Sequence, residues 1–307
     1  MTHRVRDRKA LDVIERRRIA LSFPGQGAEQ PDMGLALATM EPGARHLITL
    51  ASDATGVDIA RAIERGGRAL AATEVLQPAL LAVSLAAARR LEALGLRPDI
   101  VLGHSLGELT AACVALDVDD ETAISLARER GAAMARAARE RPGGMIALSS
   151  ITSPLPDGLA LAAHNADDEF VVSGDDAALA LLPRAGATRL RVTGAWHSAA
   201  MAPMLDRFRE MLTLALAGRA LHATFVSAVT ASVVASSADA IDVLARGLVS
   251  PVRWVDTLRA VHAMGVTSLA LAPPAKLSRS LARRTLGTAI ELCALDTPAD
   301  LDAFAAR

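Results

Sequence analysis

The feature that most constrains the fold is a serine between two glycines, where a predicted strand turns into a predicted helix. The segment from Asp99 to Leu102 follows Pro98 and is typical of a short buried strand, and Glu108 to Ala115 follow a helical pattern. Residues 103–107 read GHSLG and leave room only for a sharp turn. Such a turn presents Ser105 at a helix N-terminus, whose partial positive charge favours a developing oxyanion. In a chain rich in glycine and alanine the pattern could arise by chance, so its strand–turn–helix context is what favours a nucleophilic serine.

The rest of the chain alternates between the same kinds of segment. Strands are predicted at Ile19–Phe23, Phe225–Thr230 and Ser268–Leu271, and helices at Gly34–Leu50, Leu76–Leu94, Asp120–Arg139 and Met201–Leu216. Shorter elements follow residue 144, with strands expected at Met145–Ser150, Glu169–Ser173 and Thr188–Val192 and helices at Leu155–Ala163 and Asp175–Leu182. We therefore expect a large α/β domain with a mainly parallel sheet at 19–138 and 201–307, a small inserted α+β domain at 139–200, and a charged extension at 1–18.

Composition excludes several classes of function. The 307 residues carry 33 basic and 34 acidic side chains, so the basic excess usual for a nucleic-acid-binding protein is missing. No apolar run is long enough to predict a membrane span. The two cysteines, Cys113 and Cys293, form neither a disulfide framework nor a metal-ligand spacing. We expect a cytoplasmic protein without a nucleic-acid or membrane partner.

A serine nucleophile needs a base, and seven histidines are candidates. Five of them lie in the N-terminal extension, at expected surface or loop positions or, like His104, beside Ser105 with a side chain expected to point away from it. His164 and His197 remain, and His197 lies in the distinctive GAWHS loop at 194–198. No acidic residue stands at an obvious hydrolase-like position between Ser105 and His197, which favours a Ser–His dyad. On the residues alone, a purely structural role for His197 stays equally open.

Seven motifs in a fixed order give the chain a family resemblance. They are FPGQG at 23–27, LQPAL at 76–80, GHSLGE at 103–108, RG with a methionine at 130–134, HNA at 164–166 followed by VVSG at 171–174, GAWHS at 194–198 and SPVRW at 250–254. With them the chain resembles the malonyl-CoA:acyl carrier protein transacylases and the related acyltransferase domains of polyketide synthases, over about residues 19 to 300. The resemblance implies an α/β-hydrolase-like large domain and a ferredoxin-like small domain.

The resemblance also implies roles for individual residues. Ser105 would be the acylated nucleophile and His197 its base, and the backbone N–H groups of Gln26 and Leu106 would form the oxyanion hole. Arg130 would hold the free carboxylate of a malonyl group in a bidentate pair, although alone it reads as an exposed helix arginine. The other residues implied to line the substrate site are Gln77, His104, Asn165 and Trp196. Neither a metal nor a cofactor is implied, because the CoA thioester is itself a substrate.

The implied activity is ping-pong transfer of a malonyl group from CoA to the phosphopantetheine thiol of an acyl carrier protein, and we expect a monomer. Gly247 stands where the family commonly has a glutamine that orients the histidine, and Trp196 replaces a usual phenylalanine. A carbonyl at Gly247 could still accept from the imidazole. These departures suggest a specialised relative in polyketide or related secondary metabolism. Three alternatives stay open: a hydrolase of acyl-carrier-protein thioesters, a transferase for another acyl group, and a catalytically weak protein that docks carrier proteins.

Overall fold

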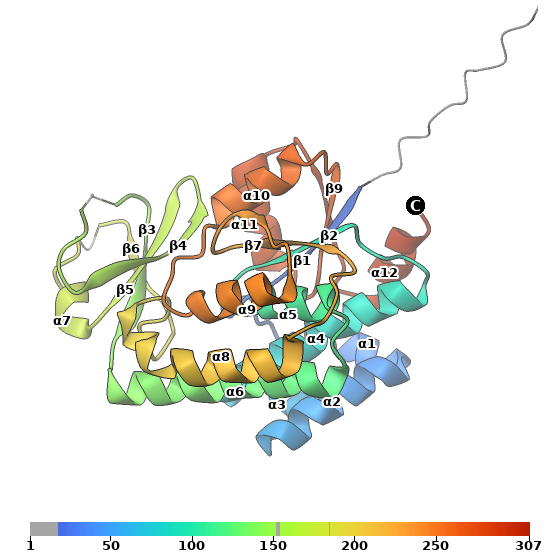
Figure 1. Ribbon diagram of the computed structural model, residues 1–307, viewed down its shortest axis with the longest axis horizontal. Helices are drawn as coiled ribbons and strands as arrows, with labels where there is room; N and C mark the ends of the chain where they lie inside the picture. The colour runs from blue at the N-terminus through green and yellow to red at the C-terminus, as the bar shows by residue number, and fades with distance from the viewer. Residues whose placement is uncertain (1–17, 152–153, 184) are drawn as a thin grey trace, which may run out of the picture.

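The computed structural model describes residues 18–151, 154–183 and 185–307, and its strands form a large and a small sheet (Figure 1). Nearly all of the predicted charged extension at 1–18 therefore lies outside the described residues. The large sheet has the order β10 (Glu291–Ala294), β9 (Ser268–Leu271), β1 (Ile19–Phe23), β2 (Ile100–Gly103), β7 (Thr224–Ser227) and β8 (Ser232–Val233). Its first five strands are parallel, and only the short β8 pairs in the antiparallel direction.

The parallel strands are short apolar runs because both of their faces are covered. Every residue of β2 and of β9 is buried, as expected for a sheet with helices on both sides. The register of β1 and β2 pairs Phe23 with Gly103, at the carboxyl ends of both strands. The loop that follows β1 and the turn that follows β2 consequently lie side by side, and they build one edge of the candidate site.

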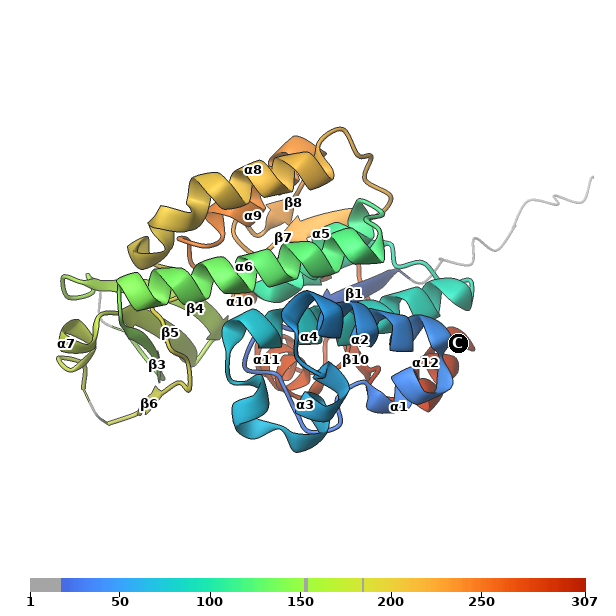
Figure 2. The same ribbon diagram turned by 90° about the horizontal axis from the view of Figure 1, so that it is seen from below.

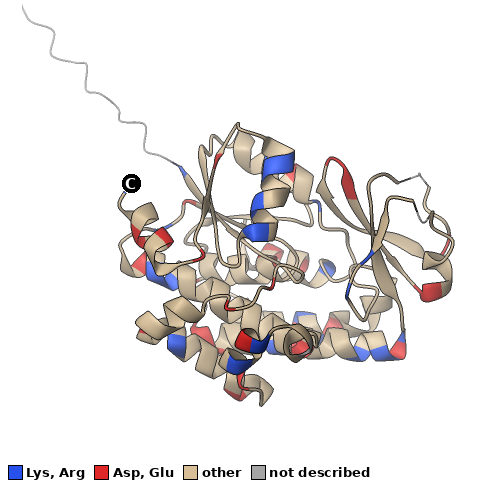
Figure 3. Ribbon diagram, turned by 180° about the vertical axis from the view of Figure 1, so that it is seen from behind, with Lys and Arg blue, Asp and Glu red and all other residues tan. Residues whose placement is uncertain are grey.

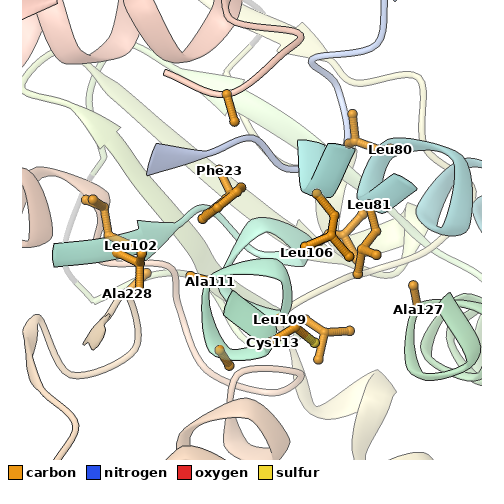
Figure 4. Packing of buried hydrophobic residues seen from close by; sticks show 14 of the residues in the cluster. Phe23, Leu80, Leu81, Leu102, Leu106, Leu109, Ala111, Cys113, Ala127 and Ala228 are labelled. Atoms are coloured by element: carbon orange, nitrogen blue, oxygen red, sulfur yellow. The ribbon is translucent and has the colours of Figure 1, made fainter. Parts of the chain in front are cut away.

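The helices lie on both sides of the large sheet. They are α1 (Leu35–Met40), α2 (Pro42–Thr55), α3 (Ile59–Arg65), α4 (Thr73–Ala93), α5 (Leu106–Ala115), α6 (Asp120–Glu140), α8 (Leu205–Leu216), α9 (Ser237–Arg246), α10 (Trp254–Ala263), α11 (Lys276–Leu286) and α12 (Pro298–Ala305), with 3₁₀ turns η1 (Gly67–Leu70) and η2 (Ala199–Met204). Figure 1 shows α10 above the sheet and α4, α5 and α6 below it. Figure 4 shows Phe23 and Leu102 of the sheet near Leu106 and Leu109 of α5, in the core.

One predicted helix, Gly34–Leu50, is two helices in the structure. Helix α1 ends at Met40 and α2 begins at Pro42. Glu41 between them is extended, with φ −112° and ψ 118°, because the residue before a proline is pushed out of the helical region. Proline is also well suited to the first position of the new helix, where no backbone donor is needed.

The small sheet has the order β4 (Leu159–Ala166), β5 (Glu169–Gly174), β3 (Gly144–Leu148) and β6 (Ala187–Arg189), and every neighbouring pair is antiparallel. Numbered within this unit, the order is 2-3-1-4, which is the order of a ferredoxin-like sheet. Helix α7 (Asp176–Leu179) lies in the connection from β5 to β6. The boundaries proposed for the small domain, 139 and 200, stay a prediction.

The helix predicted at Leu155–Ala163 is wrong, because most of that segment belongs to strand β4. The alternation of side chains that marks a strand is interrupted in β4 for a structural reason. Its register against β5 shifts between Leu161 and Ala163 and again between His164 and Ala166. Each irregularity adds a residue to one strand and reverses the alternation of side chains, so a run of alanine and leucine resembles a helix.

Two features connect the small sheet to the large one. Helix α6 runs from beneath the large sheet to the start of β3 (Figure 2). Strand β4 also bridges to Val252, just before α10, through hydrogen bonds of 2.9 Å from His164 N–H to the Val252 carbonyl and from Val252 N–H to the Ala162 carbonyl. The small sheet thereby covers the carboxyl edge of the large sheet, where Ser105 lies.

Candidate active site

The turn between β2 and α5 holds Ser105 in a strained backbone conformation. Its φ and ψ are 53° and −105°, a combination that residues other than glycine rarely adopt. The turn needs glycine on both sides, because a side chain at Gly103 would collide with the Gly107 backbone and one at Gly107 with the Phe23 carbonyl. Ser105 is therefore presented at the N-terminus of α5, as the sequence predicts.

His197 lies opposite Ser105 with a defined tautomer. Its Nε2 is 2.8 Å from Ser105 Oγ, and its Nδ1 is 2.7 Å from the Gly247 carbonyl and 3.1 Å from that of Ser250. Since carbonyl oxygens only accept hydrogen bonds, Nδ1 carries the proton and Nε2 accepts from the serine hydroxyl. The expectation that a carbonyl at Gly247 can hold the imidazole in place of a glutamine side chain is confirmed.

Burial keeps the imidazole of His197 neutral. Loss of solvent, and next the positive charge of Arg130, lower the pKa of His197 to about 3. The ring is therefore available as a proton acceptor at neutral pH. His164, the other candidate base, stacks on Phe170 with ring centroids 4.5 Å apart, on the β4–β5 hairpin.

Arg130 points from α6 toward the serine. It is only 5% exposed, which excludes the simple interpretation of an exposed helix arginine. Its Nη2 donates to Ser105 Oγ at 3.3 Å and its Nη1 to Gln77 Oε1 at 2.8 Å. No ion pair joins it to a carboxylate among the described residues. Burial, opposed in part by the charge of Glu108, lowers the pKa of Arg130 to about 10, so the guanidinium stays charged.

A chain of polar side chains holds Arg130 from behind. Gln77 Nε2 donates to Thr73 Oγ1 at 2.9 Å and to Met134 Sδ at 3.2 Å, and Thr73 Oγ1 donates to Gln26 Oε1 at 2.9 Å. Gln77 is fully buried and is not among the residues that line the pocket. The expectation that Gln77 lines the cavity is therefore wrong, because the guanidinium of Arg130 lies between Gln77 and the cavity.

Two backbone donors remain free next to the serine. Among the described residues, the N–H groups of Gln26 and Leu106 donate to no protein acceptor. Leu106 begins α5, and Gln26 follows β1 in the loop beside the serine turn. Two free N–H groups beside a nucleophile, one of them at a helix N-terminus, are donors that can stabilise a tetrahedral oxyanion.

A cavity of about 270 Å³ opens above Ser105 between the two sheets. From the large-sheet side it is lined by the loop at 25–28 and by His104, Ser105, Arg130, Met134, Trp254, Leu277, Ser278 and Leu281. From the small sheet and the loop after it come Met145, Ala147, Ala163, Asn165, Glu169, Val171, Leu190, Val192, Trp196 and His197. The cavity is mostly apolar with a few polar groups near the serine, which is typical of a small-molecule site.

His104 extends from the serine turn toward the small sheet. Its Nε2 is 2.7 Å from Asn165 Oδ1, and Asn165 Nδ2 donates to Glu169 Oε1 at 3.1 Å. Its ring also packs edge-on against Trp254, with centroids 5.4 Å apart. Burial lowers the pKa of His104, so the ring is neutral and donates to Asn165. His104 and Ser105 therefore have different partners, His104 on the small sheet and Ser105 on His197.

Other kinds of site are not evident in the described part of the chain. No group of three or more metal-binding side chains occurs there, and both cysteines are free and buried. None of its helices is both long and apolar enough to cross a membrane.

Several residues of the site were not singled out from the sequence. The carbonyls of Gly247 and Ser250 belong to the backbone, which any residue supplies. Thr73 lies one helical turn before Gln77, a spacing that could have paired them. Glu108 reads as an ordinary acidic residue in a first helical turn, yet it is 4% exposed.

Known proteins resemble this chain over nearly its whole length. The family described as an acyl transferase domain matches residues 22–293. The malonyl CoA-acyl carrier protein transacylase of Mycobacterium tuberculosis is 34% identical over 303 residues, covering 94% of this chain and 99% of that protein. The solved malonyl-CoA:acyl carrier protein transacylase of Helicobacter pylori has a TM-score of 0.87 at 25% identity, over 94% of this chain and 98% of its own.

A second solved structure bears on the partner. It is a malonyl-transacylase in complex with the acyl carrier protein of a type II polyketide synthase, and it is similar to this chain with a TM-score of 0.82 and 28% identity over 93% of this chain and 98% of that chain. The α/β fold with a second, antiparallel sheet is thus the fold of these enzymes. With a strained serine, a neutral histidine and a family match that spans most of its length, the chain belongs to the acyl transferase domain family.

Proposed function

We propose that this protein is a malonyl-CoA:acyl carrier protein transacylase. The observation that carries the proposal is the buried guanidinium of Arg130, 3.3 Å from the candidate nucleophile and without a carboxylate partner among the described residues. An unpaired buried charge is costly, and a malonyl group brings the anion that would pair with it. The forked donor geometry of arginine suits both oxygens of a carboxylate.

In the first half-reaction His197 acts as the base. Its Nε2 takes the proton of Ser105 as Oγ attacks the thioester carbonyl of malonyl-CoA. The N–H groups of Gln26 and Leu106 stabilise the oxyanion that forms. The C–S bond then breaks, the proton on Nε2 goes to the CoA sulfur, and a malonyl ester of Ser105 remains.

The second half-reaction runs through the same groups. A phosphopantetheine thiol gives its proton to His197 Nε2 and attacks the ester carbonyl, and Ser105 Oγ leaves with that proton. A neutral imidazole is required at the start of each half-reaction, which the lowered pKa of His197 supplies. Arg130 pairs with the malonyl carboxylate in both.

The mouth of the cavity suits an acidic carrier protein. Helix α11 contributes Leu277, Ser278 and Leu281 to the cavity wall, and its remaining side chains include four cations and no acid (Figure 3). One of these cations, Arg284, is already ion-paired with Asp168 and Glu169. The small domain also carries Arg184, Arg189 and Arg191, but Arg184 lies outside the described residues and Arg189 is ion-paired with Asp176. The names of the relatives, which include acyl carrier protein, support the same partner.

The setting of the enzyme is also proposed. Similarity to polyketide synthase proteins supports a role in polyketide or related secondary metabolism, beside the fatty-acid enzymes of the same family. Two buried free cysteines support a reducing cytoplasm. The large exposed apolar side chains of the described residues are scattered over different elements, which supports a monomer. The reaction as written needs no cofactor and no metal.

Intact-mass measurement tests the function. Incubation with malonyl-CoA should add one malonyl group to the protein, and a phosphopantetheinylated bacterial acyl carrier protein should then remove it and gain it. Ser105→Ala should abolish the adduct and lower turnover by several orders of magnitude. Ser125→Ala, at an exposed serine near the start of α6, is the matched control and should behave like the unchanged enzyme. Release of the acyl group to water faster than to the carrier thiol would instead identify a hydrolase.

A further inference from the structure

A buried carboxylate lies one helical turn beyond the candidate nucleophile. Glu108 is 4% exposed in the first turn of α5. Its Oε1 accepts a hydrogen bond from the Ser227 hydroxyl and another, 2.9 Å long, from the Ala228 N–H. Neither donor carries a charge, and burial raises the pKa of Glu108 to about 7. The proposed mechanism gives this group no role.

Glu108 shares a small cavity with the charged parts of the site. Beneath Ser105 the cavity is lined by Glu108, Arg130 and His197, together with apolar side chains and the backbone of Gly247. Two titratable groups thus face Glu108 from neighbouring elements: Arg130 from α6 and His197 from the loop before η2. Strand β7 contributes only the neutral Ser227. Because His197 is neutral, Arg130 is the one positive charge among the described residues of this cavity.

Arg130 and Glu108 stabilise each other's charge when the site is empty. The positive charge of Arg130 acts to lower the pKa of Glu108, and the negative charge of Glu108 acts to raise that of Arg130. A malonyl carboxylate would bring a second negative charge to the same guanidinium. Two carboxylates that share one cation in a dry site do not both stay ionised, and their titrations become coupled. The malonyl group would hold the forked N–H donors, so Glu108 is the carboxylate left with neutral donors alone.

We propose that Glu108 is a proton-accepting counter-charge to Arg130, which binds one proton from solvent when a malonyl carboxylate pairs with Arg130. The proposal rests on the function proposed above, because it requires a malonyl group at that guanidinium. In the step, the carboxylate of Glu108 and one solvent proton become a carboxylic acid, and the proton returns to solvent when the malonyl group leaves. With Glu108 protonated, the loaded site carries no excess negative charge to oppose the oxyanion.

Proton uptake during acylation is the direct test. The enzyme is mixed with malonyl-CoA in weakly buffered solution with a pH indicator, and the malonyl-enzyme formed is counted by intact mass. Uptake should be near zero at about pH 6, where Glu108 is already protonated, and should approach about one proton per malonyl-serine at about pH 8. Acetyl-CoA, allowed to react to the same amount of acyl-enzyme, should show no such uptake. Both substrates release the same thiol, so its ionisation cancels in the difference.

The variant Glu108→Gln identifies the proton acceptor. It keeps the size of the side chain, and the malonyl-dependent uptake should vanish while the malonyl adduct still forms. If uptake persists in this variant, the proton goes to His197 or to the malonyl group and the proposal is overturned. Equal uptake with malonyl-CoA and acetyl-CoA in the unchanged enzyme overturns it as well.

A second variant covers the case in which Glu108→Gln does not fold. Ser227→Ala removes one neutral donor from the carboxylate, which favours its protonated form and should shift the onset of uptake to higher pH. An unshifted profile would contradict the proposal. Absence of any malonyl adduct in the unchanged enzyme would be a different result, since it removes the proposed function itself.

Discussion

The two sides of the pocket are held in place by different interactions. On the large-sheet side, Ser105, Arg130 and Gln77 are joined by hydrogen bonds among side chains that are buried or nearly so. On the other side, partly exposed ion pairs add to the backbone bridge at Val252 and the His104–Asn165 hydrogen bond in attaching the β4–β5 hairpin. Arg259 of α10 pairs with Asp167 at 2.8 Å, and Arg284 of α11 pairs with Glu169 at 2.6 Å and with Asp168.

This difference suggests that the large-sheet side determines the reaction and that the small-sheet side determines the shape of the pocket. A buried network tolerates few substitutions, since each one leaves a polar partner unpaired in a dry site. Exposed ion pairs contribute only about 0–1 kcal/mol each and weaken with salt. We therefore expect large, salt-independent effects from substitutions on the first side. On the second side, substitutions of residues that line the cavity should change acyl selectivity. Substitutions that remove only an ion pair of the β4–β5 hairpin should have small effects.

The largest effect in this comparison is expected for His197→Ala. The same imidazole serves as base and then acid in both half-reactions, so its loss should slow acylation and transfer by roughly 10²- to 10⁴-fold. Rapid-quench measurement of malonyl-enzyme formation and decay checks both steps. The control is His164→Ala, which changes the β4–β5 hairpin and should cost far less. A larger loss in the control would mean that the wrong histidine has been assigned.

Trp196→Ser should alter selectivity more than rate. The Trp196 ring lines the cavity next to His197, and it lies so close over residue 194 that only glycine fits there. Its bulk should exclude a methyl branch on the acyl group, and one methyl is worth about 1–3 kcal/mol, or roughly 10- to 200-fold. The ratio of kcat/KM for malonyl-CoA and methylmalonyl-CoA measures this within each protein, so altered stability cancels. Equal values for both thioesters in the unchanged enzyme would contradict the assignment.

The smallest effect is expected for Arg284→Ala. It removes the partner of Asp168 and Glu169 and should lower the free energy of unfolding by no more than about 1 kcal/mol. The accompanying change in KM for malonyl-CoA should be less than about fivefold, and raising the salt concentration should shrink the difference between variant and unchanged enzyme. A large loss that persists in high salt would show that the hairpin attachment belongs to the rigid part of the site.

Much of the large sheet was predictable because the sequence patterns that mark its strands are local. Strands at Ile19–Phe23 and Ser268–Leu271 agree with the structure to the residue, since each is a short apolar run bounded by turns. Strand β10, at Glu291–Ala294, was missed because four residues with one charged end carry little pattern. Strand β4 was predicted as a helix because its two register shifts break the alternation that marks a strand.

Site residues that belong to a local sequence motif could be predicted. Site residues that are positioned by contacts between elements distant in the sequence could not. Ser105 and His197 were found from the turn and the loop that hold them, and they lie 2.8 Å apart. The position of Gln77 behind Arg130 depends on how α4 packs against α6, which no local pattern encodes. For the same reason the buried state of Glu108 could not be read from its place in a first helical turn, where acidic residues are usually exposed.

The central claim is that a buried arginine with no carboxylate in direct contact selects a carboxylated acyl group, and the substrate preference of Arg130→Ala tests it most directly. The measurement is kcat/KM for malonyl-CoA and for acetyl-CoA in both proteins. Breaking a buried charged pair costs roughly 2–5 kcal/mol, so malonyl-CoA should lose about 30- to 5,000-fold while acetyl-CoA changes little. The preference for malonyl-CoA would then collapse while Ser105 is still acylated. An unchanged ratio, or a preference for acetyl-CoA in the unchanged enzyme, would contradict the account.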